Sequence, residues 1–326
     1  MMPLQKPLHP DRNAMQKYLR RIDVTRIYTN RGYLVKEYEE RLGEMFHCHA
    51  AAVSSCTSGM TACLMTMDSV CKEYMIRIPS WTFVATANAV RMANRNLYFV
   101  DLGISPHVAV SEFGAAPRHP GRLLTDAAGA FGVYASGYAK VGAAPVVIST
   151  HATTVFGTGE GGIVLSNDKD FIEKIRTTIN HGIDDGRRVL SRGFNGKMSE
   201  YHAAAGLASL DAWPETRARW MDAETRYARI LGRVPRPDPR SLLPDVLLDR
   251  FAGPVMAKLN ESGIGSKAVW GRGVHTLAAY KDCPRDLMPL TENIADRTLF
   301  LPFWIDMSDS EMNFVADKFG EALRCA

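Results

Sequence analysis

The sequence predicts an α/β protein with a mainly parallel sheet, helices on both faces of that sheet, and a smaller C-terminal α/β lobe. Short apolar runs of strand length alternate along the chain with longer segments whose apolar residues recur at helical spacing. The 326 residues, of which 46% are hydrophobic and 23% charged, suffice for one large core and a second lobe.

The first hundred residues carry the alternation most clearly. Leu34, Val35, Tyr38, Leu42 and Met45 recur at helical spacing between charged residues, which predicts an amphipathic helix. In order, the expected elements are a helix over 33–46, a strand over 50–55, a tight turn over 56–59, a buried helix over 60–70, a strand over 74–78, a helix over about 82–92 and a strand over 97–100.

The alternation continues into a C-terminal lobe. Apolar runs at 123–124, 145–148 and 163–165 predict further strands, and helices are expected over about 168–180, 199–231, 255–262 and 310–323. Pro214 is expected to break the long helix, the Pro-rich stretch 233–245 to be a loop, and Ser308 with Glu311 to form a capping box. We predict a large domain over 1–210 and a small one over 211–326.

Charge and hydropathy argue against two kinds of partner. The formal net charge is +4, from 39 basic and 35 acidic residues, and basic residues stand at most two in a row, so no nucleic-acid partner is expected. The opening residues 1–13 lack the apolar core of a signal peptide, and no apolar stretch of about 18 residues follows. We therefore expect a cytoplasmic protein without a membrane partner.

The cysteines are expected to be free thiols, and no metal site is predicted. They show no CxxC spacing. His47, Cys48 and His49 are adjacent, but neighbours in an extended chain point to opposite faces and no second ligand cluster follows. The six cysteines are Cys48, Cys56, Cys63, Cys71, Cys283 and Cys325.

Several side chains fall where an α/β fold binds ligands, at the carboxyl ends of strands. Ser58 and Gly59 lie in the turn after the first strand, which suits a helix cap or an anion site. Asp126 follows an apolar pair and precedes small residues; it is either a helix cap or an acid that keeps a heteroaromatic nitrogen protonated. Trp81 is either core or a flat surface for a cofactor ring.

The stretch 149–162 is rich in both hydroxyls and glycines. Hydroxyl side chains stand at 149, 150, 153, 154 and 158, and glycines at 157, 159, 161 and 162. Such a loop approaches a phosphate closely. No GxGxxG follows the first strand, which disfavours a dinucleotide-binding enzyme.

These segments, in this order, resemble the DegT/StrS family of nucleotide-sugar aminotransferases, which have the type I aminotransferase fold. The resemblance implies pyridoxal 5'-phosphate or pyridoxamine 5'-phosphate as cofactor, a nucleotide-linked sugar as substrate and a homodimer with a shared active site. It is carried by NRGYLVKEYEERLG, AVSSCTSGMTA, IPSWTFVATANAV, YFVDLG, TDAAGAFG, STHATTVFGTGEGGIVLSND, INHGI, GFNGKMSEYHAAAGLASL and LFLPFWIDMSDSEM.

Carried over position by position, the resemblance assigns the candidate binding residues. It implies that Trp81 lies against the pyridine ring and that Asp126 pairs with the ring nitrogen. Asn195 would reach the phosphate from the second subunit, and Lys197 stands where the family has a basic residue. The cofactor phosphate would be met by Ser58, Gly59 and Ser149.

The departures from the family pattern concern the chemistry. Thr154 stands where the family has the lysine that forms the internal Schiff base and then moves the proton. A threonine hydroxyl forms no imine and is too weak a base, so ordinary transamination is expected to be crippled. Met60 replaces a threonine expected at the phosphate, and Gly129 replaces a polar residue beside the ring. The link from Asp101 to Asp126 is shorter than in the family, which suggests a lost βα unit and leaves open whether a strand is missing.

Three hypotheses follow. The first is an enzyme of deoxy- or aminosugar or cell-surface polysaccharide biosynthesis that uses the cofactor without a covalent link, as in the family's 3-dehydratases, which have a histidine at the lysine position. His151 is the candidate base, although ordinary members also have histidine at this place. The second is a catalytically inactive homologue that binds a nucleotide sugar or a partner protein without the cofactor. The third is that Lys140 supplies the amine.

Overall fold

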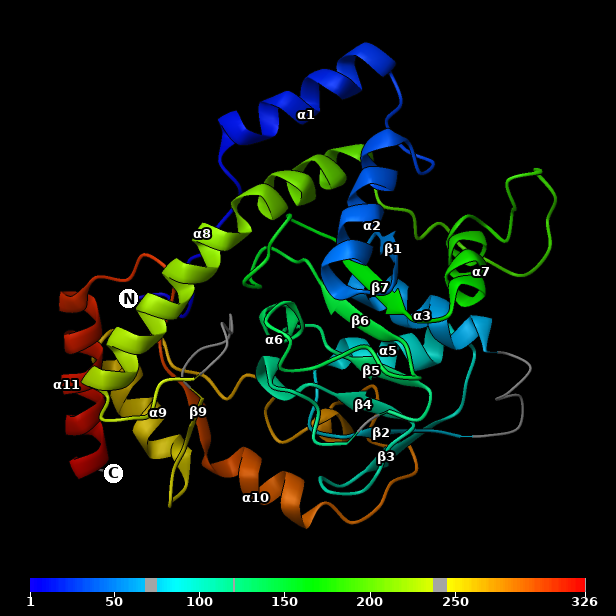
Figure 1. Cartoon of the computed structure of the whole chain (residues 1–326). Coiled ribbons are helices and arrows are strands. Elements are labelled where there is room, and N and C mark those ends of the chain that lie inside the picture. Colours follow the sequence, from blue (N-terminus) through cyan, green and yellow to red (C-terminus); the bar gives the residue numbers. More distant parts are fainter. Residues whose placement is uncertain (68–74, 120, 237–244, 326) are drawn as a thin grey trace.

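The computed structural model describes residues 1–67, 75–119, 121–236 and 245–325, and its main sheet confirms the predicted α/β class (Figure 1). Strands β4, β5 and β6 run parallel, whereas β7 is antiparallel to both of its neighbours. The order across the sheet is β1 (His49–Val53), β7 (Gly162–Ser166), β6 (Val146–Ser149), β5 (Leu124–Asp126) and β4 (Val108–Val110).

A parallel pair, β2 (Ile76–Pro79) and β3 (Leu97–Val100), continues this sheet beyond β4. The amide of His107, just before β4, donates to the carbonyl of Arg77 in β2 at 2.8 Å. The carboxyl ends of the parallel strands therefore share one edge, where helices begin and ligands are expected.

Helices cover both faces of the main sheet. Successive strand residues point to opposite faces, so Val146 and Ile163 enter one core while Val147 and Val164 enter the other. Each fully buried side chain of this kind contributes roughly 1.5–3 kcal/mol. One face is covered by α3 (Cys56–Thr66), α5 (Val84–Met92) and α7 (Lys169–Ile179), the other by α2 (Tyr33–Phe46), α6 (Phe131–Ala135) and α8 (Glu200–Ile230).

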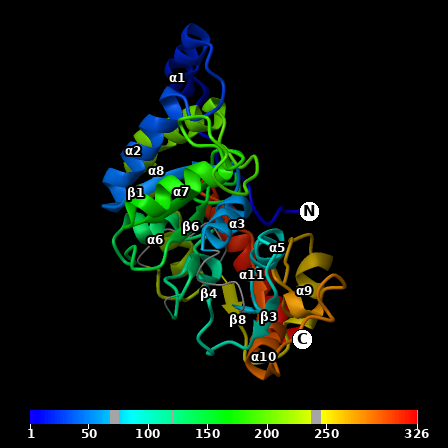
Figure 2. The ribbon, with the colours of Figure 1, turned by 90° about the vertical axis from the view of Figure 1, so that its right-hand side faces the viewer.

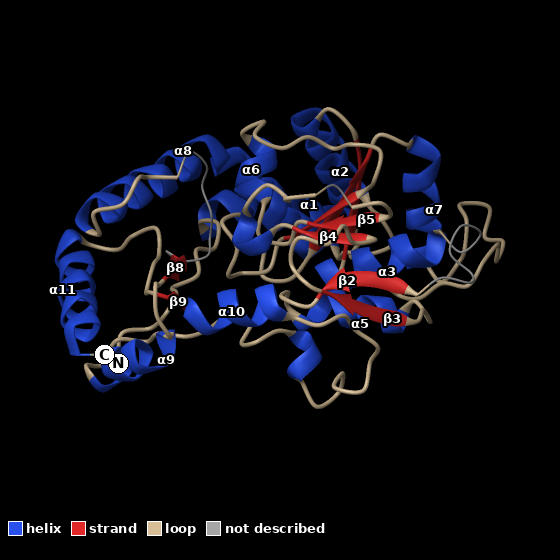
Figure 3. Ribbon diagram, turned by 90° about the horizontal axis from the view of Figure 1, so that it is seen from below, coloured by secondary structure: helices blue, strands red, loops and turns tan. Residues whose placement is uncertain are grey.

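The C-terminal lobe has its own antiparallel strand pair, which Figure 3 shows apart from the main sheet, near α9 and α11. At the opposite end of the molecule α1 (Arg12–Thr25) lies along α8 (Figures 1 and 2). No helix in the described ranges is both long and apolar enough to cross a bilayer. The lobe consists of β8 (Asp245–Leu247), α9 (Ala252–Glu261), α10 (Pro289–Arg297), β9 (Thr298–Phe300) and α11 (Asp309–Cys325).

Most predicted elements are present. The helix over 33–46 has its predicted bounds, and the capping box is formed, because the Ser308 amide donates to Glu311 Oε2 and the Glu311 amide to Ser308 Oγ. The predicted break at Pro214 is wrong: α8 is continuous through it, because buried side chains on both sides of the proline hold the helix despite the lost hydrogen bond. Residues 68–70 and 74 of two predicted elements, and 237–244 of the predicted loop, lie outside the described residues. The division at residue 210 stays a prediction.

The link between β3 and β5 contains the strand β4, which pairs in parallel with β5. Apart from residue 120, which is not described, the segment 101–123 contains no α-helix and a single 3₁₀ turn, η1 (Glu112–Gly114). The suggested loss of a βα unit relative to the family stays a prediction.

The free edge of β1 is closed by a buried carboxylate. Glu39 in α2 accepts the Ala52 amide at 3.0 Å through Oε1, and it accepts Arg31 Nε at 2.8 Å and Arg176 Nη2 at 2.9 Å through Oε2. Arg176 Nη2 also donates to the Ala50 carbonyl at 2.9 Å. The edge strand thus has its exposed backbone groups paired with side chains.

A second buried carboxylate joins α8 to α2. Glu200 accepts the amides of Leu34 and Val35, at 2.8 and 3.2 Å. The N-cap residue of α2 is Gly32, which offers no side-chain acceptor, so Glu200 caps this helix from a distant part of the chain.

We predict that Glu39→Ala destabilises the protein by about 1–3 kcal/mol, because it leaves the buried Ala52 amide without its acceptor and removes a carboxylate from the half-buried Arg31 and Arg176. Urea unfolding measures this. Glu173→Ala is the matched control: its carboxylate also contacts Arg176, but its side chain is 50% exposed, so the expected loss is below about 1 kcal/mol. Equal losses in both variants would contradict the assignment of Glu39 as the closure of the sheet edge.

Candidate active site

Asp126 ends β5 with a buried carboxylate that has no cationic partner among the described residues. The residue is 5% exposed, Oδ2 accepts the Thr86 hydroxyl at 2.6 Å, and Oδ1 accepts the Ala128 amide at 3.1 Å. Burial raises the pKa of this carboxyl, although the two hydrogen bonds oppose the shift. No Lys, Arg or His within the described ranges forms an ion pair with it. A ligand that carries an N–H⁺ group would supply the missing charge.

Trp81 lies after the end of β2, and β4 separates this strand from β5. Trp81 is buried, and the hydroxyl of the next residue, Thr82, is 2.8 Å from that of Thr86, which binds Asp126. Its ring meets Phe113 and Trp270 edge-on, with centroid distances of 5.0 and 5.7 Å. Trp81 and Asp126 are therefore brought to one end of the sheet, as expected from the sequence.

The N-terminus of α3 gathers hydroxyl groups. Ser55 caps the helix by accepting the Ser58 amide at 3.1 Å, and Ser58 Oγ lies 3.0 Å from Ser54 Oγ and 2.9 Å from Ser55 Oγ. The amides of Cys56 and Thr57 stand in the first turn, where no carbonyl of the same helix accepts them. Thr57, which is half-buried, adds a hydroxyl to this anion-binding arrangement.

Gly59 does not belong to that arrangement. Its amide donates to the Ser55 carbonyl at 3.0 Å, and a Cβ built on it would lie 2.9 Å from Val147 Cγ1 in the sheet. Met60 is likewise in the core, so its side chain takes no phosphate contact away. The sequence predicted a helix that begins at Met60, whereas α3 begins at Cys56; the serine pair before Cys56 is a signal for the earlier start and for the role of Thr57.

Thr154 is bound within its own loop. Its amide donates to the His151 carbonyl at 2.9 Å, and its hydroxyl has that same carbonyl at 2.9 Å and the Phe156 carbonyl at 3.1 Å as acceptors. The single hydroxyl proton is thus used by the backbone. Ser149, at the end of β6, is buried and accepts the His151 amide at 3.1 Å, which leaves its own proton free to donate to an anion.

The hydrogen bonds of His151 do not suit a role as a general base. Nδ1 accepts the Thr153 amide at 3.2 Å and lies 2.8 Å from the Thr153 hydroxyl, so the ring proton is on Nε2. Nε2 lies 3.7 Å from Glu160 Oε1, and the side chain is 45% exposed. In this tautomer the lone pair that a base needs is already used, whereas Nε2–H remains available as a donor.

Asn195 lies at the far edge of the sheet. The segment that contains it pairs outside β1: the Ser54 amide donates to the Gly196 carbonyl at 2.8 Å, and Val53 bridges Lys197. Four strand spacings then separate this segment from Asp126, roughly 19 Å. Asn195 is exposed, so the structure does not bring it to Asp126 within one chain.

Lys140 is placed at the opposite end of the sheet. It is exposed and precedes β6, so it lies at the amino end of that strand, whereas Ser149 is at the carboxyl end. Asn167, which follows the antiparallel β7, donates to the nearby carbonyls of Val141 and Gly142. The structure therefore contradicts the suggestion that Lys140 supplies the amine.

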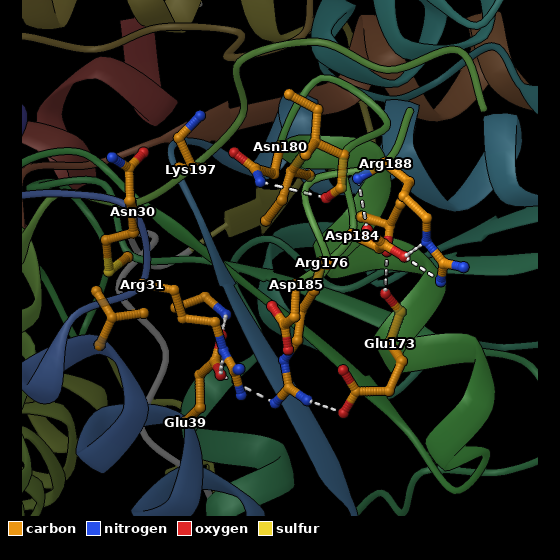
Figure 4. Close-up of a pocket in the computed structure, with 17 residues that line it drawn as sticks. Asn30, Arg31, Glu39, Glu173, Arg176, Asn180, Asp184, Asp185, Arg188 and Lys197 are labelled. Atoms are coloured by element: carbon orange, nitrogen blue, oxygen red, sulfur yellow. Dashed lines mark hydrogen bonds and ion pairs between the residues drawn. The ribbon is translucent and has the colours of Figure 1, made fainter. Parts of the chain in front are cut away.

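A polar cavity of about 420 Å³ adjoins the closed edge of β1 (Figure 4). It contains the Glu39 ion pairs, and Asp184 is held there by Arg188 at 2.6 Å. Lys197 lines it apart from these pairs, and burial lowers the pKa of its amine. None of the residues proposed from the sequence for cofactor binding or catalysis lines this cavity, although Asn195 stands two positions before Lys197 in the chain.

The arrangement fits a flat aromatic ring with a protonated nitrogen and an anionic group. Asp126 suits the nitrogen and Trp81 the ring, and the α3 N-terminus with Ser149 suits the anion. Thr154, at the position where the resemblance implies the attachment lysine, offers no amine. Within the described part of the chain no three His, Cys, Asp or Glu side chains group as metal ligands. Free thiols are present at Cys48, Cys56, Cys63, Cys283 and Cys325, and Cys71 lies outside the described residues.

Comparison with known proteins identifies related chains. The model of the DegT/DnrJ/EryC1/StrS aminotransferase family matches residues 10–110 and 114–320. Protein Rv3402c of Mycobacterium tuberculosis (strain ATCC 25618 / H37Rv) is 27% identical over 246 residues, which are 64% of this chain and 60% of that protein. The chain thus spans less than two thirds of this curated relative.

Solved structures share the fold. A Bacillus cereus ATCC 10987 protein assigned as a PLP-dependent aminotransferase has a TM-score of 0.90 at 23% identity, covering 98% of this chain and 99% of its own. DesI, solved in the presence of its TDP-sugar product, has a TM-score of 0.81 at 26% identity, covering 99% and 93%. PseC of Helicobacter pylori, an aminotransferase involved in pseudoaminic acid biosynthesis, has 0.83 at 20%, covering all of both chains. The type I aminotransferase-like fold is confirmed.

We predict that Asp126→Asn stabilises the unliganded protein near neutral pH. Because burial raises the pKa of Asp126, the folded state loses stability as pH rises from the ordinary value of 3.8 through the raised one, and the amide removes this cost. Urea unfolding at a series of pH values measures it; the gain should vanish below that ordinary value.

Asp211→Asn is the control of opposite sign. Burial opposes the shift, but hydrogen bonds from Lys17, Tyr18 and Arg41 outweigh it and lower the pKa of Asp211. That variant should lose stability at neutral pH and match the parent in acid. A loss of stability at neutral pH in Asp126→Asn would show that the buried carboxylate is compensated within the chain.

Proposed function

The chain belongs to the DegT/DnrJ/EryC1/StrS aminotransferase family, and on that premise we propose that it binds pyridoxal or pyridoxamine phosphate non-covalently and acts on a nucleotide-linked sugar. We place this role in deoxy- or aminosugar or cell-surface polysaccharide biosynthesis in the cytoplasm. DesI supports the substrate class, since that relative was solved with a TDP-sugar product. PseC supports the biosynthetic setting, because it is an aminotransferase involved in the biosynthesis of pseudoaminic acid.

The observation that carries the proposal is the buried Asp126 carboxylate without a cation. The free-energy cost of burying this carboxylate in the unliganded chain is offset when a pyridinium N–H⁺ donates to it. A carboxylate that served only as a structural cap would not require such a donor. When bound, the cofactor supplies a ring that withdraws electrons from the reacting carbon.

The chain's own residues then have distinct tasks. Asp126 keeps the proton on the ring nitrogen, and Trp81 orients the ring. Ser58, Thr57 and Ser149 donate to the phosphate together with the first amides of α3. Thr154 donates its hydroxyl proton to the loop backbone and supplies no amine to the reaction. His151 offers a proton from Nε2.

A homodimer with a shared site is part of the proposal. Asn195, with a polar side chain exposed at the far sheet edge, is available to a second chain. The same end of the molecule exposes aromatic side chains: Tyr28 and Tyr201 stack with a centroid distance of 6.2 Å, and Tyr33 is exposed nearby in sequence. Exposed aromatic groups of this kind are common in protein interfaces.

A second candidate function is an inactive homologue that binds a nucleotide sugar or a partner protein without the cofactor. The Thr154 hydroxyl favours it, because a loop that uses this side chain for its own backbone needs no cofactor for its shape. Gly129, which offers no polar group beside the ring, points the same way. The two candidates differ in whether the protein binds a chromophore.

We predict saturable, Asp126-dependent binding of pyridoxal or pyridoxamine phosphate in an absorbance titration from about 300 to 500 nm, with no borohydride-reducible adduct. Asp126→Asn should weaken binding at least about tenfold, because one charge-assisted hydrogen bond is lost. Absence of binding of either form would reject the proposal and favour the inactive homologue.

Two variants complete this experiment. Thr154→Lys should create a reducible link with pyridoxal phosphate, since the amine then stands at the attachment position. Lys140→Ala should leave the titration unchanged, because Lys140 lies at the other end of β6. A reducible adduct in the parent that Lys140→Ala removes would contradict both the placement and the proposal.

We predict complementation between chains. Asp126→Asn and Asn195→Ala each impair binding alone, but mixing them after unfolding and refolding should restore roughly a quarter of the sites, as random pairing of two chains in a two-fold dimer requires. Equilibrium titration of the mixture measures the sites. Simple averaging of the two defects would show that Asn195 serves no partner's site.

A further inference from the structure

Ser80, directly before Trp81, is clamped by a segment from the C-terminal lobe. The residue is fully buried, its Oγ accepts the His275 amide at 3.2 Å, and its carbonyl accepts the Val274 amide at 2.8 Å. Ser80 Oγ also lies 2.5 Å from His275 Nδ1. Two residues that are 195 positions apart therefore meet through both backbone and side chain.

The proton positions in this contact follow from satisfaction of buried groups. Ser80 Oγ already accepts the His275 amide, and its own proton needs an acceptor, which Nδ1 provides among the described residues. The imidazole proton is then on Nε2, which faces Glu292 Oε1 of α10 at 3.4 Å. The neutral ring with Nδ1 as acceptor is the form that fits this structure.

The same segment holds Trp81 by its ring. Trp270 packs edge-on against Trp81, and Phe113 stacks on Trp270 with a centroid distance of 4.0 Å. Between Trp270 and His275 the chain turns at Gly273, whose φ is +106° and where a Cβ would lie 2.8 Å from Ser80 Oγ. A glycine is required for this close approach. The segment therefore fixes both the turn before Trp81 and the ring of Trp81.

We propose that His275 is a positioning residue: by accepting the Ser80 hydroxyl it holds Trp81 in the orientation that the cofactor ring requires. It is not a catalytic residue, because its side chain is buried and Ser80 has no access to a substrate. The orientation of Trp81 by His275 follows from the structure alone. Its importance for the cofactor ring rests on the proposed function.

Removal of the acceptor tests the assignment. Without Nδ1 the buried hydroxyl proton of Ser80 has no acceptor among the described residues, so Trp81 should lose its fixed position. The charged groups that face the imidazole are Glu292 of α10, which is 41% exposed, and Arg272 of its own segment, which binds both Glu292 and Asp296.

The experiment compares His275→Leu, which has no acceptor, with His275→Asn, whose amide oxygen replaces Nδ1. The readout is near-ultraviolet circular dichroism of the unliganded protein near neutral pH, with Trp81→Phe identifying the signal of the Trp81–Trp270 pair. We expect the leucine variant to lose this signal. The asparagine variant should keep it, because its amide oxygen accepts the Ser80 hydroxyl in place of Nδ1.

Cofactor affinity is the second readout. We expect pyridoxamine phosphate to bind about tenfold more weakly to His275→Leu and within about threefold of the parent to His275→Asn. Ser80→Ala, which removes the donated proton without enlarging the side chain, should reproduce the loss of signal and serves if the leucine variant does not fold. An unchanged Trp81 signal in His275→Leu or Ser80→Ala, or equal losses in the leucine and asparagine variants, would overturn the proposal. If the parent binds no cofactor, the proposed function fails while the dichroism still decides the role of His275.

Discussion

The closure of the β1 edge by Glu39 is the interaction on which the rest of the architecture depends. One buried carboxylate binds an amide of β1 and two arginines from different segments, and so joins α2, α7 and the sheet. Glu200 caps α2, and Asp101 does the same for α10 by accepting the amides of Leu290 and Thr291. In each place an acid that would be costly to bury alone is satisfied by backbone donors and stabilises a junction between distant segments.

Asp126 differs from these acids in what it lacks. Among the described residues it has a hydroxyl and one amide as donors, but no arginine and no set of helix amides, and burial raises the pKa of its carboxyl. A fold that satisfies its other buried carboxylates has therefore kept one that is incompletely compensated, at the carboxyl end of the central strands. Such local cost is typical of binding sites, where a ligand completes the interaction.

The loop at 149–162 is held together by its own backbone contacts. The Thr154 hydroxyl donates to backbone carbonyls, and the loop turns at Gly161, where a Cβ would lie 2.4 Å from Thr150 Oγ1. The shape of the loop therefore depends on contacts within the chain. His275, in contrast, contributes to the site from outside by fixing the turn that precedes Trp81.

Local pattern in the sequence determined the fold class, the helix over 33–46 and the residue type at position 154, because periodicity and side-chain chemistry need no distant partner. Tertiary structure decided the rest. In the folded chain α3 begins at Cys56, so Gly59 packs in the core. α8 continues through Pro214, and Lys140 and Ser149 lie at opposite ends of β6. Tertiary structure also brought His275 to Ser80. The physical reason is that hydrogen-bond partners and burial are set by segments far apart in the chain, whose approach no local spacing encodes.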